Sequence, residues 1–342
     1  MSLKTGLRGL VKKASAAVVA VAAAASLMVA GTGTAAADNM NWLRPGCRWD
    51  SEFPGGVPDW VQRCDVYSEA MGKNIAVQIR PAERGGNAAL YLLDGLRAQD
   101  TYNAWTRDSY APAKFKGTNI ALVMPIGGAA SFYADWEGPA KFSSVEPVNY
   151  KWETFLTKEL PGYLQQNFGV SPNNNSIAGL SMGGTAAMNL AAKHPEQFRQ
   201  VLSYSGYLST TMPGMQTLLG IALIDGGGFN INAMYGGLIN PRRFENDPFL
   251  NMEGLRNTDV YVSAGNGVPR ANEWGMEPRF MIPGSALEIF ARYTTGLWTL
   301  KARAQGINFT EDFPPYGLHN WTQFDDQLNW TRDRILRVMN AY

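Results

Sequence analysis

The chain has 342 residues, of which 45% are hydrophobic and 17% are charged. This composition is typical of a globular protein and excludes a disordered tail, a collagen or a coiled coil. The first 37 residues hold four basic residues and no acidic one, which leaves 26 basic and 29 acidic groups, a net charge of −3, in the rest. A nucleic-acid binder needs a basic stripe, which this sequence lacks, so we expect no nucleic-acid partner.

Residues 1–37 have the pattern of a secretory signal peptide. A basic stretch precedes an apolar run from Ala16 to Ala30, and three alanines ending at Ala37 provide small residues for cleavage. The run is shorter than the ~20 apolar residues that a membrane-spanning helix needs. We therefore expect cleavage near Ala37, export to the cell envelope or medium, and one catalytic domain over residues 38–342.

Cys47 and Cys64 are the only cysteines in the chain. One pair cannot supply the four ligands of a structural zinc site. In an oxidising compartment, a pair near the start of the mature chain is expected to form a disulfide, here around a loop rich in proline and glycine. The alternative is two buried free thiols.

After this loop, short runs rich in β-branched and aromatic residues alternate with helical stretches. This alternation predicts an α/β fold with a mostly parallel sheet and helices on both faces. Residues 209–257 are rich in glycine, methionine, asparagine and proline, and predict a helical or loop insertion over the carboxyl edge of the sheet. The expected strands are 73–80, 88–95, 119–128, 175–181, 200–206, 259–267 and 307–313. The expected helices are 150–168, 183–198, 284–305 and 320–340.

A nucleophile motif stands between an expected strand and an expected helix. Residues 179–183, with the sequence GLSMG, match the pattern G-x-S-x-G. On such a strand-turn-helix elbow, small residues relieve crowding and the serine oxygen stands clear of the backbone. The helix amino terminus adds positive potential where an oxyanion would develop. Ser181 is therefore the candidate nucleophile, and the alternative is a glycine-rich turn with an idle serine.

A serine needs a general base, and the sequence holds two histidines. His194 lies on the helix that begins at the elbow, nearly 20 Å from Ser181 at ~1.5 Å per residue, so it cannot reach the nucleophile. His319 follows an expected strand and a loop with proline and glycine. That place suits the base in the chain order Ser…acid…His of α/β-hydrolases, so His319 is the candidate base.

The acid of the triad should lie between Ser181 and His319, after the expected strand at 259–267. The residues alone leave the choice open. Generic spacing favours the loop just after the strand. The candidates are Glu273, Glu277 and Glu288.

An oxyanion hole requires two backbone amides, one from the residue after the nucleophile and one from a loop after an early strand. The first residue is Met182. The second lies in the sequence DGLR, where Leu96 is the candidate donor. Its neighbours Asp94 and Arg97 could form a local surface ion pair, which contributes little to stability.

Long motifs that are typical of one family lie in order from about Met71 to the end of the chain. They include LYLLDGLRAQDTYNAW, YKWETFLTKELPGYL, GLSMGG and GLHNW. With them the chain resembles the secreted mycolyltransferases of the antigen 85 complex and their corynebacterial relatives. The resemblance implies an α/β-hydrolase fold and transfer of a mycolyl group from trehalose monomycolate to another acceptor.

The resemblance also implies roles for single residues. The family's acid is a glutamate in an apolar helical stretch roughly thirty residues before the histidine, and Glu288 has that position, 31 residues before His319. The family's second oxyanion donor is the leucine of DGLR, here Leu96. The implied sugar contacts are Asp94, Arg97 and Trp321.

The chain departs from the family pattern at three places. Gly183 directly follows Met182, Asn320 replaces a serine after the histidine, and residues 105–108 differ from the family's WDIN. The last two departures lie in the implied sugar pocket, and therefore bear on the choice of acceptor.

The expected protein is an exported acyltransferase with trehalose monomycolate and sugar acceptors as partners. We expect no cofactor, no metal and a monomer, with the lipid surface of the envelope as a further candidate partner. The same triad would serve a secreted carboxylesterase, in which water replaces the sugar hydroxyl. A matrix-binding envelope protein would be marked by a degraded triad, and every triad element is present.

Overall fold

In the computed structural model, which describes residues 39–50, 59–143, 145 and 147–342, nine strands form one sheet in the order β1-β2-β3-β5-β4-β6-β7-β8-β9. The predicted signal peptide lies outside the described residues. The strands are β1 (Cys47–Trp49), β2 (Gln62–Ser68), β3 (Lys73–Arg80), β4 (Ala88–Leu93), β5 (Ile120–Pro125), β6 (Asn175–Leu180), β7 (Phe198–Tyr204), β8 (Asp259–Ser263) and β9 (Thr310–Asp312).

Six adjacent strands run parallel, as the sequence predicts: β5, β4, β6, β7, β8 and β9. β4, β5 and β6 are buried at every residue, because parallel strands are covered on both faces. β1, β2 and β3 add an antiparallel edge beside β5. β1 and β2 belong to this edge and were not expected from the sequence.

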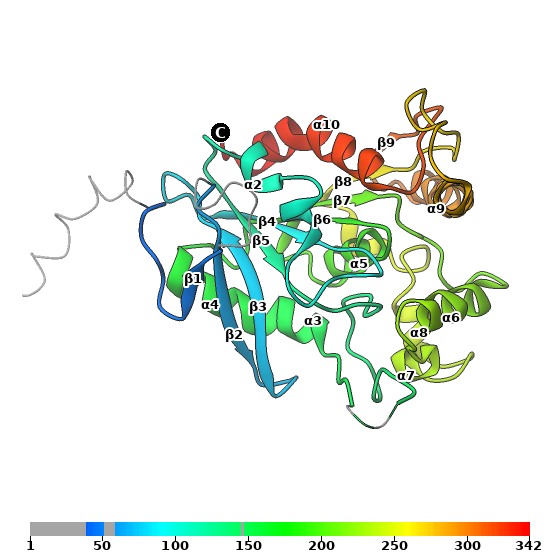
Figure 1. Cartoon of the computed structure of the whole chain (residues 1–342), viewed down its shortest axis with the longest axis horizontal. Helices are drawn as coiled ribbons and strands as arrows, with labels where there is room; N and C mark the ends of the chain where they lie inside the picture. The colour runs from blue at the N-terminus through cyan, green and yellow to red at the C-terminus, as the bar shows by residue number, and fades with distance from the viewer. Residues whose placement is uncertain (1–38, 51–58, 144, 146) are drawn as a thin grey trace, which may run out of the picture.

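Helices cover both faces of the sheet (Figure 1). They are α1 (Ala104–Arg107), α2 (Ala111–Lys114), α3 (Trp152–Thr154), α4 (Leu160–Phe168), α5 (Met182–Lys193), α6 (Met215–Asp225), α7 (Ile231–Tyr235), α8 (Pro241–Glu245), α9 (Pro278–Ala304) and α10 (Trp321–Met339). A π-helical turn, Phe155–Glu159, joins α3 to α4. Among the described residues, no helix is both long and apolar enough to cross a bilayer.

Alternate side chains of β4 divide the core into two layers, because successive residues of a strand point to opposite faces. Tyr91 and Leu93 belong to the layer that contains apolar side chains of α4 and α5. Leu90 and Leu92 belong to the layer that contains those of α2 and α10. The nucleophile elbow joins β6 to α5, and thus stands at the centre of the sheet.

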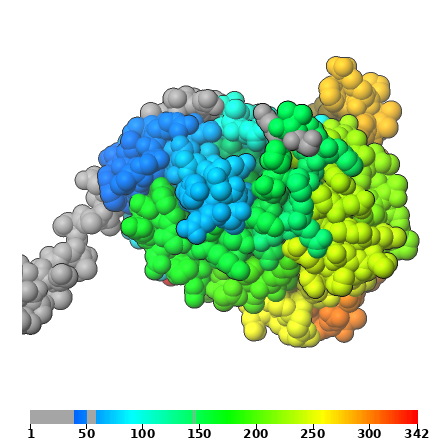
Figure 2. Space-filling view, turned by 90° about the horizontal axis from the view of Figure 1, so that it is seen from below, coloured from blue at the N-terminus to red at the C-terminus, as the bar shows by residue number. Residues whose placement is uncertain are grey.

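Residues 209–257 form the predicted insertion, with α6, α7, α8 and a 3-10 turn at Glu253–Leu255. At the end of α6, Asp225 forms an ion pair with Arg97 of the loop that follows β4. The insertion therefore contacts the carboxyl edge of the sheet. In Figures 1 and 2 it forms the side of the molecule away from β1 and β2.

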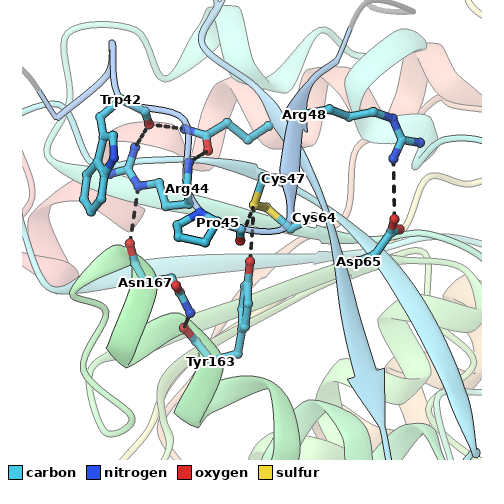
Figure 3. The surroundings of a disulfide bond; sticks show 10 residues. Trp42, Arg44, Pro45, Cys47, Arg48, Cys64, Asp65, Tyr163 and Asn167 are labelled. Atoms are coloured by element: carbon cyan, nitrogen blue, oxygen red, sulfur yellow. Dashed lines mark hydrogen bonds and ion pairs between the residues drawn. A yellow bond between two sulfur atoms is a disulfide. The ribbon is translucent and has the colours of Figure 1, made fainter.

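The predicted disulfide between Cys47 and Cys64 is present and joins directly opposed residues of β1 and β2 (Figure 3). Close by, the buried guanidinium of Arg44 donates a hydrogen bond to the Trp42 carbonyl at 2.6 Å and lies over the Phe168 ring at 4.8 Å. The segment before β1 is thus held against α4. Burial lowers the pKa of Arg44 to about 10, and the nearby Tyr163 opposes the shift.

We expect the double variant Cys47→Ser/Cys64→Ser to unfold with a free energy about 3 kcal/mol lower than wild type, because the crosslink restricts the unfolded chain. Urea denaturation measures the difference. A reducing agent should move the wild-type midpoint to that of the variant and leave the variant unchanged. Equal midpoints for the two oxidised proteins would contradict a stabilising crosslink.

Candidate active site

Ser181 stands at a sharp turn between β6 and α5. Its backbone has φ 53° and ψ −120°, a conformation that residues other than glycine rarely adopt. The Ser181 amide donates a hydrogen bond to the Tyr204 carbonyl of β7 at 2.9 Å. The neighbouring strand therefore holds the strained turn in place, and the geometry is that of the predicted nucleophile elbow.

The glycines of the motif are required by close backbone contacts. A Cβ atom on Gly179 would lie 2.3 Å from the carbonyl of Gly183. A Cβ atom on Gly183 would lie 2.5 Å from the carbonyl oxygen of Asp94. The first turn of α5 is thus pressed against both β6 and the loop after β4, and no larger residue fits at either position.

The structure brings Ser181, His319 and Glu288 together in one hydrogen-bonded chain. The distance from Ser181 Oγ to His319 Nε2 is 2.8 Å, and the distance from His319 Nδ1 to Glu288 Oε2 is 2.7 Å. The His319 amide donates to the Gly284 carbonyl of α9 at 3.0 Å. Both histidine and acid are therefore positioned by α9.

The Glu288 carboxylate is fully buried, and donors surround it. Its Oε1 atom accepts hydrogen bonds from the Ser205 hydroxyl at 2.7 Å and from the Gly265 amide at 2.6 Å. A buried carboxylate needs such partners, because burial without them is costly. Ser205 follows β7 and Gly265 follows β8. Neither residue is predicted from the sequence, although a position just after a parallel strand is a usable signal.

The other two candidate acids are engaged away from the imidazole. Glu273 is buried, accepts a hydrogen bond from Asn320 Nδ2 at 2.7 Å and accepts another from the Arg270 amide at 2.8 Å. Glu277 precedes α9 and forms an exposed ion pair with Arg279 at 2.9 Å. The glutamate beside the imidazole is thus Glu288, at the position implied by the family resemblance. It is not in the loop just after the strand, which generic spacing favours.

His194 ends α5 and faces a different partner. Its Nε2 atom lies 3.2 Å from a carboxylate oxygen of Glu153, and its Nδ1 atom lies 3.5 Å from Glu196. It is therefore a partly buried capping residue of α5, separate from the elbow. No group of three or more His, Cys, Asp or Glu side chains in the described part of the chain is placed to hold a metal ion.

Two backbone segments lie beside the nucleophile where an oxyanion would form. Met182 is the first residue of α5, so its amide has no acceptor within the helix. The loop with Leu96 lies against the elbow, because a Cβ atom on Gly95 would lie 3.8 Å from the Ser181 Cβ. The Leu96 carbonyl accepts a hydrogen bond from the Ala130 amide at 2.9 Å, which holds the loop.

The alternative of a local ion pair between Asp94 and Arg97 is not what the structure shows. Asp94 is buried, and its two carboxylate oxygens accept hydrogen bonds from the amides of Gly95 and Ala104, each at 2.9 Å. Arg97 is exposed and pairs with Asp225 of α6 instead. The physical reason is that the chain leaving β4 has buried amides that need an acceptor, which Asp94 supplies.

Trp321 begins α10 and is part of an aromatic cluster next to the histidine. Its ring meets the rings of Trp105 and Phe324 edge-on, at centroid distances of 5.3 Å and 5.9 Å. Phe324 also meets the His319 ring edge-on at 5.2 Å. The preceding residue, Asn320, caps α10 by accepting a hydrogen bond from the Gln323 amide. Trp321, which the resemblance implies as a sugar contact, and Asn320, a departure in the implied sugar pocket, thus both lie next to the histidine.

Burial raises the pKa of Asp94 to about 6; hydrogen bonds from Ala104 and Gly95 oppose the shift, and the charge of Asp108 adds to it. Because this pKa is higher in the folded than in the unfolded chain, the protonated carboxyl stabilises the fold. That stability is full below about pH 4 and is lost as the pH rises through about 6.

We therefore expect the unfolding free energy of wild type, relative to Asp94→Asn, to fall by roughly 2 kcal/mol between pH 4 and pH 7. Chemical denaturation at the two pH values measures it. Asp225→Asn, which changes an exposed carboxylate, is the control and should follow wild type. The same pH dependence in wild type and Asp94→Asn would contradict a raised pKa.

Comparison with known sequences gives one family. A family model described as "Putative esterase" matches residues 68–334. The diacylglycerol acyltransferase/mycolyltransferase Ag85C of Mycobacterium leprae is 38% identical over 289 residues, 84% of each chain. The Ag85A protein of Mycobacterium tuberculosis is 37% identical in an alignment that covers 100% of this chain and 97% of that protein.

Solved structures agree with this assignment. Mycobacterium tuberculosis MPT51 (FbpC1) has a TM-score of 0.70 and 29% identity, covering 82% of this chain and 98% of its own. The serine hydrolase FphF of Staphylococcus aureus, at a TM-score of 0.61 and 16% identity, covers 81% of this chain and 97% of its own, and shows the fold alone. The predicted α/β-hydrolase fold and family resemblance are confirmed. This chain belongs to the Ag85 diacylglycerol acyltransferase/mycolyltransferase family.

Proposed function

We propose that this protein is an exported serine acyltransferase that moves a mycolyl group from trehalose monomycolate to a sugar hydroxyl through an ester on Ser181. The observation that carries the proposal is the hydrogen-bonded chain from Ser181 Oγ through His319 to Glu288, at 2.8 Å and 2.7 Å. The relatives named as mycolyltransferases support the identity of the acyl group.

In the first half-reaction, Ser181 Oγ attacks the ester carbonyl of the donor while its proton passes to His319 Nε2. Glu288 holds the imidazole through Nδ1 and stabilises its positive charge. The carbonyl oxygen becomes an oxyanion, which the amides of Met182 and Leu96 stabilise. The bond to the trehalose oxygen then breaks, and His319 returns the proton to that oxygen.

In the second half-reaction, an acceptor hydroxyl gives its proton to His319 and attacks the acyl-serine carbonyl. The bond to Ser181 Oγ breaks, and Oγ takes the proton back from His319. Water in place of the sugar would give hydrolysis by the same steps. Transfer in place of hydrolysis therefore depends on the groups that bind the acceptor, which we place at Arg97 and Trp321. Asp94 holds the loop that carries Leu96 and Arg97.

Export is part of this proposal. Residues 1–37 have the pattern of a signal peptide, and a disulfide is typical of proteins outside the reducing cytosol. Outside the cytosol, the enzyme would reach the mycolyl acceptors of the envelope. The amino-terminal sequence of protein recovered from the medium or envelope tests this part, and cleavage near Ala37 is expected.

The test of the function is incubation of purified enzyme with trehalose monomycolate, followed by separation of the products. One molecule serves as donor and a second as acceptor, so trehalose dimycolate and free trehalose are expected. Free mycolic acid as the main product would make the protein a carboxylesterase. Ser181→Ala is the control, and dimycolate made by this variant would overturn the acyl-serine route.

We expect Arg97→Ala to lower transfer to trehalose acceptors by about 10-fold or more, because a charged donor makes the stronger hydrogen bonds to sugar hydroxyls. Hydrolysis of a small activated ester should be largely unchanged. The exposed ion pair with Asp225 contributes at most about 1 kcal/mol, so the melting temperature should hardly move.

Asp225→Asn is the matched control, because it removes the ion pair and keeps the guanidinium. It should transfer like wild type. A parallel loss of transfer, hydrolysis and melting temperature in Arg97→Ala would assign Arg97 a purely structural role.

A further inference from the structure

The segment that follows β5, residues 127–133, has an unusual backbone, and we call it the β5 loop. Ala130, Phe132 and Tyr133 have φ values of 59°, 50° and 48°, in the left-handed region that favours glycine. Strain of this kind persists only where the surrounding structure fixes it, and it is concentrated at functional sites. The contacts of the β5 loop therefore indicate what the strain maintains.

The β5 loop binds the backbone of the segment that carries Leu96. The Asp94 amide donates a hydrogen bond to the Tyr133 hydroxyl, and the Ala130 amide donates one to the Leu96 carbonyl, each at 2.9 Å. The peptide unit that contains the Leu96 amide lies between these two hydrogen bonds in the chain. Its orientation is therefore fixed on both sides by the β5 loop.

The β5 loop also contacts the second residue that we assign to the oxyanion. The Phe132 amide donates a hydrogen bond to Met182 Sδ at 3.3 Å, and both residues are buried. Phe132 is the neighbour of Tyr133 in the strained backbone. One short segment therefore contacts both Leu96 and Met182, although these two residues belong to different elements.

Two aromatic side chains at the start of α3 hold the β5 loop in turn. The Tyr150 hydroxyl donates a hydrogen bond to the Ala129 carbonyl at 2.9 Å. The Trp152 ring meets the Tyr133 ring edge-on, at a centroid distance of 5.4 Å. A Cβ atom on Gly128 would lie 2.9 Å from the Trp152 ring, so the backbone is closely packed there. The β5 loop is thus a rigid support.

We propose that Tyr133 is a positioning residue of the oxyanion hole, whose hydroxyl accepts the Asp94 amide and so fixes the direction of the Leu96 amide. This inference rests on the proposed function. The ester oxygen becomes negative only in the tetrahedral state, and donors stabilise it best when they are held in place before the reaction. Tyr133 should therefore affect the rate of the reaction and not the binding of the ground state.

The test variant is Tyr133→Phe, which keeps the ring beside Trp152 and removes the acceptor of the Asp94 amide. We expect kcat for p-nitrophenyl butyrate to fall by roughly 10- to 100-fold, because a small displacement of an oxyanion donor has an effect of this size, with KM within about twofold of wild type. The affinity for butylboronic acid, which forms a tetrahedral adduct with a serine oxygen, should fall by the same factor as kcat. The acidic limb of the pH–rate profile should not move, because His319 keeps its partners.

Tyr261→Phe is the matched control. Tyr261 is also buried, and its hydroxyl donates a hydrogen bond to Gln327 Oε1 at 2.8 Å, between β8 and α10. This variant should lose a comparable amount of melting temperature and keep a kcat near that of wild type. A second test variant, Tyr150→Phe, removes a support of the β5 loop and should lower kcat in the same way by a smaller factor.

Equal kcat values in Tyr133→Phe and Tyr261→Phe would overturn the inference. A lower kcat with unchanged affinity for butylboronic acid would also overturn it, because the oxyanion would then be bound as in wild type. A shifted acidic limb would do the same by assigning the effect to His319. If Tyr133→Phe does not fold, Tyr150→Phe decides by the same criteria. Absence of Ser181 labelling by a fluorophosphonate in wild type would instead overturn the acyl-serine mechanism itself.

Discussion

Alanine at position 181 should lower the turnover of trehalose monomycolate on the order of 10⁶-fold, because the triad loses the atom that forms the acyl bond. The fold should survive, since the Ser181 backbone is held by the Tyr204 carbonyl and by the glycines around it rather than by the hydroxyl. Turnover is measured by product separation, and folding by circular dichroism and thermal unfolding.

Ser203→Ala is a matched control, because Ser203 is another buried serine, one strand away on β7, and its hydroxyl is without a hydrogen-bond partner in the described structure. It should retain turnover near that of wild type. Near wild-type transfer by Ser181→Ala would remove Ser181 as the nucleophile. Loss of folding in both variants would show instead that this part of the sheet does not tolerate alanine.

Much of the parallel sheet could be predicted from the sequence because its signals are local. The strand expected at 73–80 has those bounds in the structure, and the elbow follows a buried run of six residues. The glycines of the elbow are informative for a physical reason, since their neighbours leave no space for a Cβ atom. Chain order, together with the distance between Ser181 and His194 along the helix, then distinguishes His319 from His194 as the candidate base.

The antiparallel edge could not be predicted in the same way. β1 has three residues, and among the described strands it pairs with β2 alone. Its strand character therefore depends on that partner and on the disulfide rather than on its own composition. α9 also starts earlier than expected, at Pro278, because the helix continues through Pro283. A proline inside a helix normally costs stability, so sequence analysis places the start after it.

The side-chain partners of the site depend on contacts between distant segments, which local patterns do not contain. Asp94 binds two backbone amides, and Arg97 reaches across to α6. Ser205 and Gly265 both reach Glu288 because β7 and β8, which they follow, are neighbours in the sheet. The triad acid shows this limit most clearly. The local sequence around Glu273, Glu277 and Glu288 does not distinguish them, and only the contact of Glu288 with the distant His319 does.

Glutamine at position 288 should lower turnover by about 10⁴-fold. Both carboxylate oxygens of Glu288 face donors, with His319 on Oε2 and with Ser205 and Gly265 on Oε1. A glutamine must present its NH₂ group to one of these donors. Where it faces Nδ1, the imidazole must carry its proton on Nε2, and Nε2 can then no longer accept the proton of Ser181.

The matched variants Glu273→Gln and Glu277→Gln separate this effect from a general loss of acidic charge. Glu277 is exposed and paired with Arg279, so its variant should be almost silent. Glu273 holds Asn320, the residue after the histidine, so its variant should show a modest loss. Steady-state turnover of all three, with melting temperatures, decides between them. A collapse in Glu273→Gln with Glu288→Gln tolerated would move the acid to Glu273, because only the partner of the imidazole sets its tautomer.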